Sequence, residues 1–293
     1  MIHVMPNETS YDDLRPLLMS IAYRMLGSVG DAEDVVQESF LRFHRALGDG
    51  VQVESPKAYL TTVVTRLAID QLRSARVQRE RYIGPWLPEP VVDGSSDVAA
   101  EAEIADSLSM AFLVLLERLS PVQRAVFLLR DVFRYEFAEI ASVVDRSESN
   151  CRQILVRARR HLEDGRTRFD VSRPERDELA GRFLAACRDG DLDGLTQLLA
   201  ADAAFVGDGG GKAQGLPRPV FGRDKVARLL AGFGNQYAGL QVRFEPVRVG
   251  GQPGALLWSG DELLAVWSLD VVDGVVSTVR SVVNPDKLAH IRY

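Results

Sequence analysis

The hydrophobic period of this chain changes near Pro174, and one fold cannot accommodate both patterns. Up to about Arg168, apolar residues recur three or four positions apart, which is the period of amphipathic helices. After Pro174, two further helical stretches lead to four short apolar runs separated by Gly, Asp and Pro, which predict strands. The 293 residues are therefore expected to form all-α modules followed by an α+β domain with a mostly antiparallel sheet.

The helical part begins with two amphipathic segments. Residues 31–47 place four apolar side chains on one face, namely Val36, Phe40, Phe43 and Leu47. Residues 55–81 begin with Ser-Pro, a typical N-cap followed by a first helical residue. The second half of this segment contains five arginines, and the spacing predicts a salt bridge between Arg66 and Asp70.

Residues 83–106 differ in composition from both neighbours. From Tyr82 to Glu117 there is no Lys or Arg, whereas acidic side chains recur. The stretch begins with YIGPWLPEP, and its Pro, Gly and Ser residues are typical of a linker. Trp86 is unusual in a solvated linker, because so large an apolar side chain usually packs on another part of the protein. An acidic spacer exposed to solvent is the alternative interpretation.

Residues 107–168 return to helical spacing and end in a basic helix. Two helical patterns flank the short polar turn DRSES, which predicts a helix-turn-helix. In the second helix the apolar stripe consists of Cys151, Leu155, Ala158 and Leu162. Arginines can neutralise DNA phosphates, and polar side chains near the start of such a helix can reach base edges. The candidates for DNA contact, whose alternative is a solvated helix face, are Ser149, Asn150, Arg152, Gln153, Arg157, Arg159 and Arg160.

The sequence GDGGGK at Gly207–Lys212 suggests a phosphate-binding loop. A P-loop requires a leading glycine and then Gly-Lys-Ser/Thr, but Val206 occupies the leading position and Ala213 follows the lysine. A G-x-G-x-x-G fingerprint that opens a helix is also absent. The glycines are therefore predicted to form a tight turn at the end of a strand.

The remaining composition excludes several classes of protein. Apolar and charged fractions of 46% and 26% are typical of globular domains. Cys151 and Cys187 form no C-x-x-C, and the four histidines are scattered, so we expect no metal, no disulfide and no cofactor. The N-terminal residues lack a signal pattern and no apolar run is long enough to span a membrane, so we expect a soluble, cytoplasmic protein.

Two basic helical modules joined by an acidic linker suggest a protein that contacts DNA at two separated places. These segments resemble bacterial sigma factors of the extracytoplasmic-function group. The sequence DAEDVVQESFLRFHR at residues 31–45 is similar to their region 2 helix, residues 58–76 look like the helix that follows it, and residues 119–162 resemble region 4. The resemblance implies an RNA polymerase subunit that binds the β′ clamp and β of the core enzyme and directs initiation at −10 and −35 promoter elements.

The resemblance also implies a domain order and roles for individual residues. The domains are region 2, the linker, region 4 and a C-terminal domain, at residues 1–82, 83–106, 107–168 and 174–293. The side chains implied to bind core polymerase are Asp31, Glu33, Asp34, Gln37, Glu38 and Leu41. Those implied to bind the −10 element are Arg66, Arg73 and Arg76, and the basic helix of region 4 is implied to bind the −35 element.

A subgroup of these sigma factors carries a fused C-terminal domain similar to SnoaL-like polyketide cyclases, a cone-shaped α+β fold with a pocket. The chain resembles that subgroup in YIGPWLPEP, in DGGGK at residues 208–212 and in NPDKL at residues 284–288. The resemblance implies that the extra domain regulates the sigma modules from within the same chain, where tethering gives it a high effective concentration. The internal contacts expected on this basis involve Trp86, Leu87, Pro88, Asp208, Gly209, Gly210, Gly211, Lys212, Asn284, Pro285, Asp286, Lys287 and Leu288.

Three other functions compete with this hypothesis. The C-terminal domain could retain a cyclase or isomerase activity, for which Asp208 and His290 are the only acid–base candidates, although no catalytic residue is assigned. It could instead sense a small ligand in its pocket. A stand-alone helix-turn-helix regulator would need no region 2 helix and would usually dimerise on a palindrome, whereas the sigma hypothesis predicts a monomer when the chain is free.

Overall fold

The structure of the chain, a computed structural model, describes residues 11–79, 82–93, 108–163, 172–213, 215–239 and 242–291. It divides into two compact units. The helical unit contains the described residues between 11 and 77 and between 116 and 163, and the sheet unit contains most of the others. The described linker residues 82–93 therefore group with the C-terminal domain rather than standing apart from it. No helix within the described ranges has the length and hydropathy of a membrane span.

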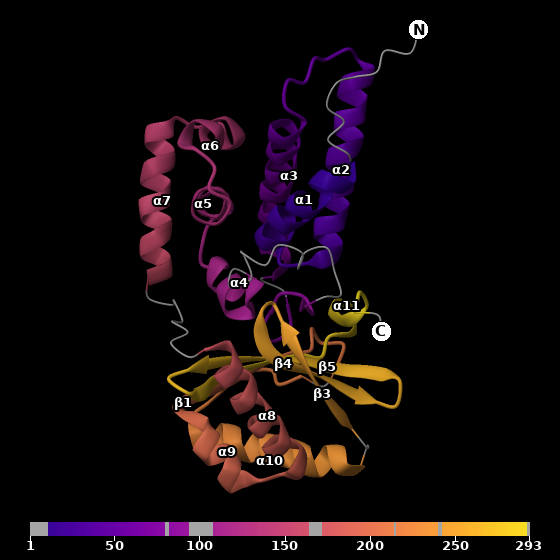
Figure 1. Ribbon diagram of the computed structural model, residues 1–293, viewed down its shortest axis with the longest axis vertical. Coiled ribbons are helices and arrows are strands. Elements are labelled where there is room, and N and C mark those ends of the chain that lie inside the picture. The colour runs from indigo at the N-terminus through magenta and orange to yellow at the C-terminus, as the bar shows by residue number, and fades with distance from the viewer. Residues whose placement is uncertain are drawn as a thin grey trace. The chain divides into compact units, whose positions relative to one another are not determined.

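The helical unit contains two groups of helices (Figure 1). The first group is α1 (Tyr11–Leu26), α2 (Val29–Gly48) and α3 (Pro56–Arg79). The second is α5 (Pro121–Phe127), the π-helix η3 (Leu128–Val132), α6 (Phe137–Val144) and α7 (Glu148–Glu163). The predicted start of α3 is confirmed, since Ser55 Oγ accepts a hydrogen bond from the Ala58 N–H at 3.2 Å.

Burial follows the predicted helical stripes with one exception. All four apolar residues assigned to the buried stripe of α7 are buried. In α2 the prediction is wrong for Leu47, which is 39% exposed. The buried residues of α2 end at Phe40, and Phe43 is half-buried against the Tyr59 ring, so burial of the stripe decreases toward the end of this helix. Helical spacing marks a face, but it does not show how far along the helix that face is covered.

The sheet unit contains six strands, β1 (Leu199–Asp208), β2 (Val220–Phe221), β3 (Arg243–Val249), β4 (Gln252–Ser259), β5 (Glu262–Val272) and β6 (Val275–Val282). Their order is β2-β1-β6-β5-β4-β3, and only β1 and β6 pair in parallel. The predicted two-residue hairpin turn joins β5 to β6, with Asp273 and Gly274 at φ values of 50° and 73°. The helices of this unit are α8 (Arg173–Asp189), α9 (Leu192–Leu198), α10 (Arg223–Gly239), α11 (Pro285–Leu288) and most of α4 (Met110–Leu116).

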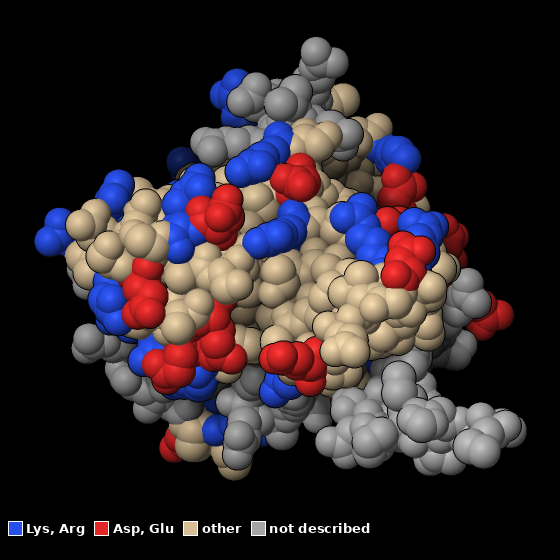
Figure 2. Space-filling view, turned by 90° about the horizontal axis from the view of Figure 1, so that it is seen from above, with Lys and Arg blue, Asp and Glu red and all other residues tan. Residues whose placement is uncertain are grey.

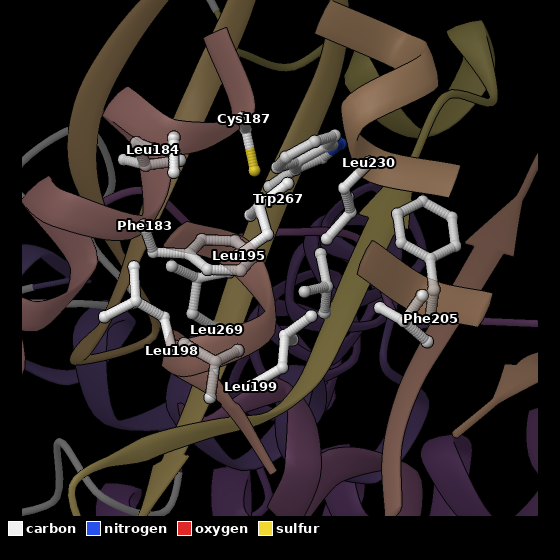
Figure 3. Close-up of a cluster of buried hydrophobic side chains, with 14 of the residues drawn as sticks. Phe183, Leu184, Cys187, Leu195, Leu198, Leu199, Phe205, Leu230, Trp267 and Leu269 are labelled. Atoms are coloured by element: carbon white, nitrogen blue, oxygen red, sulfur yellow. The ribbon is translucent and has the colours of Figure 1, made fainter. Parts of the chain in front are cut away.

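The two faces of this sheet bury different apolar clusters. Helices α8, α9 and α10 lie together against one face (Figure 1). Between them and the sheet lies a cluster of buried apolar side chains (Figure 3), in which Trp267 contacts Phe205 and Phe244 edge to face. On the other face, Leu87 and Val92 of the linker pack with Met110 and Leu288. The linker therefore supplies part of a core rather than spanning solvent.

The apolar cluster beneath α8 predicts an unreactive thiol. Cys187 on α8 is 1% exposed, and burial raises the pKa of its thiol. Because the thiolate is the nucleophile, Cys187 is expected to resist alkylation by iodoacetamide at pH 8 until the sheet unit unfolds. Mass spectrometry of the native and urea-treated chain checks this. Rapid labelling of Cys187 in the native chain would mean that the cone interior is open.

Candidate nucleic-acid interface and linker site

The outer face of α7 presents the polar side chains predicted to contact DNA. Ser147 Oγ accepts the Asn150 N–H at 3.2 Å and so begins the helix. The buried stripe turns the opposite face to solvent, and the candidates exposed there are Ser149, Arg152, Gln153, Arg157, Arg159 and Arg160. Asn150 is half-buried, and Val156, which sequence reasoning did not select, is 49% exposed on the same helix.

Two of these arginines already have partners within the unit. Arg159 donates to both carboxylate oxygens of Asp131, at 2.9 and 2.6 Å, and this hydrogen bonding raises its pKa. Asp131 lies in η3, so the π-helix places the carboxylate that holds α7. Arg152 pairs with Glu148 at 2.8 Å. The binding of DNA by Arg152 and Arg159 stays a prediction. It would require each arginine to share its guanidinium between DNA and its carboxylate or to leave the carboxylate.

The candidate residues on α3 differ in what they contact. Arg66 does not pair with Asp70, which binds Arg73 at 3.0 Å instead. The Arg66 guanidinium donates to the carbonyl oxygens of Ser142 and Val143 at 2.8 and 2.9 Å. These carbonyls end α6, where a helix leaves carbonyl oxygens unsatisfied and favours a cation, so α6 competes with Asp70 for Arg66. The side chain of Arg76 lies outside the described residues.

Further contacts join the first group of helices to the second. Thr61 Oγ1 and Tyr135 Oη are 3.0 Å apart. The guanidinium of Arg124, which is 2% exposed, donates to the Met25 carbonyl at 2.5 Å. A cleft of about 510 Å³ lies between α3 and the α5–α6 pair, and residues of both groups of helices line it, Arg66 among them. In this structure the two modules thus pack together, and the Arg66 side chain reaches from the first group to the second.

The polar face of α2 carries the six residues predicted to bind core polymerase. Leu41 is 45% exposed, and Asp34 and Gln37 are also exposed. Glu33 lies 3.7 Å from Arg15, Glu38 binds Arg42 at 2.8 Å, which lowers the pKa of Glu38, and Asp31 is half-buried near the start of the helix. Charged side chains of both signs are interspersed over the face shown in Figure 2.

Asp208 is the centre of the linker site. It ends β1 with its side chain fully buried. Oδ1 accepts the Tyr82 hydroxyl at 2.5 Å, and Oδ2 accepts the Leu87 N–H and the Lys287 ammonium, each at 2.7 Å. Burial, followed by the hydrogen bond to Asp208, raises the pKa of Tyr82, so the phenol remains a donor. A buried carboxylate thus binds two parts of the linker and one lysine.

Lys287 completes the site from α11. Its ammonium also donates to the Leu87 carbonyl at 2.5 Å and lies 4.9 and 4.4 Å from the ring centroids of Tyr82 and Trp86. Asn284 caps α11 by accepting the Asp286 N–H, and it donates to the Tyr82 hydroxyl at 2.9 Å. Trp86 therefore packs on a cation rather than standing in solvent.

The glycines of GDGGGK make room for the linker. The loop is a turn, as predicted, with the Lys212 N–H bound to the Gly209 carbonyl at 2.9 Å. A Cβ at Gly210, where φ is +59°, would lie 2.3 Å from Asn284 Nδ2 and 2.7 Å from the Tyr82 hydroxyl. A Cβ at Gly211 would lie 2.8 Å from Ile83. Lys212 itself forms an exposed ion pair with Asp286 outside the buried site.

The remaining predicted contact residues complete this surface. Leu87 is 2% and Leu288 6% exposed in the second apolar cluster. Pro88 is buried beside Leu87, and Pro285 is the first residue of α11. A Cβ at Gly209 would lie 2.7 Å from the Ala213 carbonyl oxygen, so this position also requires glycine.

A second contact of the linker was not predicted. Val92 forms an antiparallel bridge with Val249, and the Asp93 N–H donates to the Arg248 carbonyl at 3.0 Å. The turn between β3 and β4 donates back, from the Gly250 N–H to the Val91 carbonyl at 2.8 Å and from the Gly251 N–H to Asp93 Oδ1 at 3.0 Å. The only sequence signal was the Gly-Gly pair itself, which specifies a turn but no partner.

Both acid–base candidates of the enzyme hypothesis bind the linker. Asp208 uses both carboxylate oxygens, as described above. The His290 ring lies 2.9 Å from the Pro90 carbonyl through Nε2 and 3.9 Å from Glu89 through Nδ1. In this structure the linker therefore occupies the groups that acid–base chemistry would need.

Comparisons with known proteins agree with this division of the chain. The family model described as Sigma-70 region 2 matches residues 10–77, Sigma-70 region 4 matches residues 109–162, and a SnoaL-like domain matches residues 180–280. The chain is 40% identical over 291 residues to the ECF RNA polymerase sigma factor SigJ of Mycobacterium tuberculosis, covering 95% of this chain and 92% of the relative. It is 32% identical over 281 residues to the probable ECF sigma factor SigI of that organism, covering 95% and 93%.

A solved structure gives the same result for the fold. The crystal structure of M. tuberculosis SigJ superposes with a TM-score of 0.77 at 38% identity, covering 96% of this chain and 97% of that one. The helical modules followed by an α+β sheet domain are thus those expected from the sequence.

Proposed function

The chain belongs to the extracytoplasmic-function RNA polymerase sigma factors, and we propose that its SnoaL-like domain regulates initiation by holding the segment that joins region 2 to region 4. Membership implies binding to core RNA polymerase and promoter DNA, in the cytoplasm where the polymerase acts. The observation that carries the proposal is the buried Asp208 carboxylate, which binds Tyr82 and Leu87 of that segment.

Region 2 supplies the polymerase contact in this proposal. Asp34, Gln37 and Leu41 present a mixed polar and apolar surface on α2 suited to a protein partner, and we assign it to the β′ clamp, with a further contact to β. Because this surface is assigned to polymerase, it is not needed for contact with a second copy of the chain. We therefore propose that the free chain is a monomer.

Promoter binding requires regions 2 and 4 to separate. We assign the −10 element to α3 and the −35 element to the exposed face of α7. Two N–H donors of Arg66 bind α6 carbonyls in the packed unit, so its guanidinium is held toward α6. We propose that the packed helical unit is a state that does not bind a two-part promoter, and that release of the linker precedes binding.

The linker has two alternative partners in this account. Its acidic stretch lacks cations, so it suits the positively charged channel of the polymerase that RNA later occupies. In the free chain, residues 82–93 instead bind the SnoaL-like domain through two separate sets of hydrogen bonds. Because the domain is tethered, it competes for the linker at high effective concentration. We propose a non-enzymatic role for the domain, since both of its acid–base candidates, Asp208 and His290, bind the linker.

The substitution Tyr82→Phe tests this proposal. It removes one hydrogen bond to a buried carboxylate, a contact that contributes about 1.5–3 kcal/mol. The population of released linker should rise roughly 10- to 100-fold, and transcription from a two-part promoter by the full chain with core polymerase should increase. Lys212→Ala is the matched control, because it removes only an exposed ion pair of the same loop. Equal output from all three proteins would overturn the proposal.

A further inference from the structure

The ring of Phe137, at the start of α6, contacts two arginine guanidiniums, those of Arg130 and Arg152. Helices α6 and α7 lie next to each other in the helical unit (Figure 1). The guanidinium carbon of Arg152 lies 4.8 Å from the ring centroid, and that of Arg130 lies 4.9 Å from it. Phe137 is the first residue of α6 and is half-buried, whereas Arg152 lies near the start of α7 and is exposed. One aromatic ring therefore contacts two cations, Arg130 from η3 and Arg152 from α7.

Each of these arginines also binds a carboxylate. Glu148 Oε2 accepts from Arg152 at 2.8 Å, and Glu136 lies 3.1 Å from Arg130. Arg130 is fixed further by its hydrogen bond to the Tyr135 carbonyl at 2.8 Å. The positive charges of the two arginines beside the shared ring are thus balanced by carboxylates.

We propose that Phe137 is a positioning residue for Arg152 in the recognition of a guanine in the −35 element, an inference that rests on the proposed binding of that element by α7. A guanidinium that stacks on a ring keeps its N–H donors in its own plane, where they can bind guanine O6 and N7 together. The ring limits the rotamers of a long exposed side chain before DNA arrives, which reduces the ordering that binding requires.

The position of Arg152 explains why such a residue is needed. Arg157 and Arg160 lie further along α7, where phosphate contacts tolerate variation in side-chain position. A bidentate contact with a base edge does not tolerate it, because both hydrogen bonds must form in one plane. Phe137 would therefore act on base preference rather than on overall affinity.

The test compares full-length chains assembled with core polymerase on promoters randomised in the −35 element. Arg152→Ala should abolish the guanine preference at the position that Arg152 contacts. Phe137→Leu should weaken that same preference about two- to fivefold and leave the other positions unchanged, whereas Phe137→Tyr should retain it. Phe137→Leu in the Arg152→Ala background should add nothing.

The outcomes separate this proposal from the proposed function. If Phe137→Leu leaves the preference intact, or lowers the preference equally at all positions, Phe137 is not a positioning residue. If Arg152→Ala changes nothing while the wild-type chain retains a −35 preference, α7 still binds the element but the proposal for Phe137 fails. A wild-type chain with no base preference overturns both. Phe137→Met provides a second variant if Phe137→Leu does not fold, because it also removes the ring and should weaken the same preference. An unchanged preference in Phe137→Met would then overturn the proposal.

Discussion

Replacing Asp208 with alanine is expected to lower the free energy of unfolding of the sheet unit by about 3–5 kcal/mol. The substitution leaves the Lys287 ammonium, which is 8% exposed, without its carboxylate in a buried site. It also leaves the Leu87 N–H without an acceptor. The tryptophans Trp86, Trp258 and Trp267 all lie in the sheet unit, so tryptophan fluorescence during urea unfolding measures this change without interference from the helical unit.

The double variant Asp208→Ala/Lys287→Met is the control for this prediction. Removing both partners of a buried ion pair costs little compared with removing one, so most of the lost stability should return. The linker should nevertheless remain released, because Tyr82 and Leu87 still lack their acceptor. An unchanged urea midpoint in the single variant would show that Asp208 does not form the buried site described above.

Replacing Arg124 with methionine should separate regions 2 and 4 and lower the free energy of unfolding of the helical unit by about 3 kcal/mol. Arg124 donates to the Met25 carbonyl, to the Leu116 carbonyl at 3.1 Å and to Glu117 at 2.5 Å. Methionine fills a similar volume but satisfies none of these acceptors, two of which are buried carbonyl groups. Because Arg124 is not a predicted DNA contact, any gain in promoter binding would come from the separation alone.

Two measurements check the Arg124→Met prediction. Circular dichroism during urea unfolding follows the helices, and the distance between labels on α2 and α7 follows the separation. Arg188→Met, which removes an exposed ion pair with Asp189, should change neither. A wild-type distance distribution in Arg124→Met would mean that this contact does not hold the two regions together.

The sequence predicted the elements whose signals are local. The buried stripe of α7 follows from helical spacing, and the β5–β6 hairpin follows from Asp273-Gly274. The predicted turn at GDGGGK was also correct, and Asp208 of this sequence contacts both Leu87 and Asn284. That juxtaposition came from the family resemblance, since no spacing connects Asp208 to groups more than a hundred residues earlier in the chain.

The errors and omissions concern features that depend on parts of the chain distant in sequence. Arg66 bonds to α6 instead of Asp70 because two helix-terminal carbonyls are available to it. Leu47 is exposed although helical spacing places it on the apolar stripe of α2, because spacing does not show which part of a stripe is covered. The π-helix η3 has no spacing signature over five residues, and yet it places Asp131 against α7.

Hydrogen exchange at the turn between β3 and β4 tests the central claim most directly, because the Gly250 and Gly251 amides donate to Val91 and Asp93 of the linker. The account predicts that these two amides exchange slowly in the free chain and become fast when core polymerase takes up the linker. Control amides within β5 should stay protected in both states. Fast exchange at Gly250 and Gly251 in the free chain, or equal protection with and without polymerase, would contradict the account.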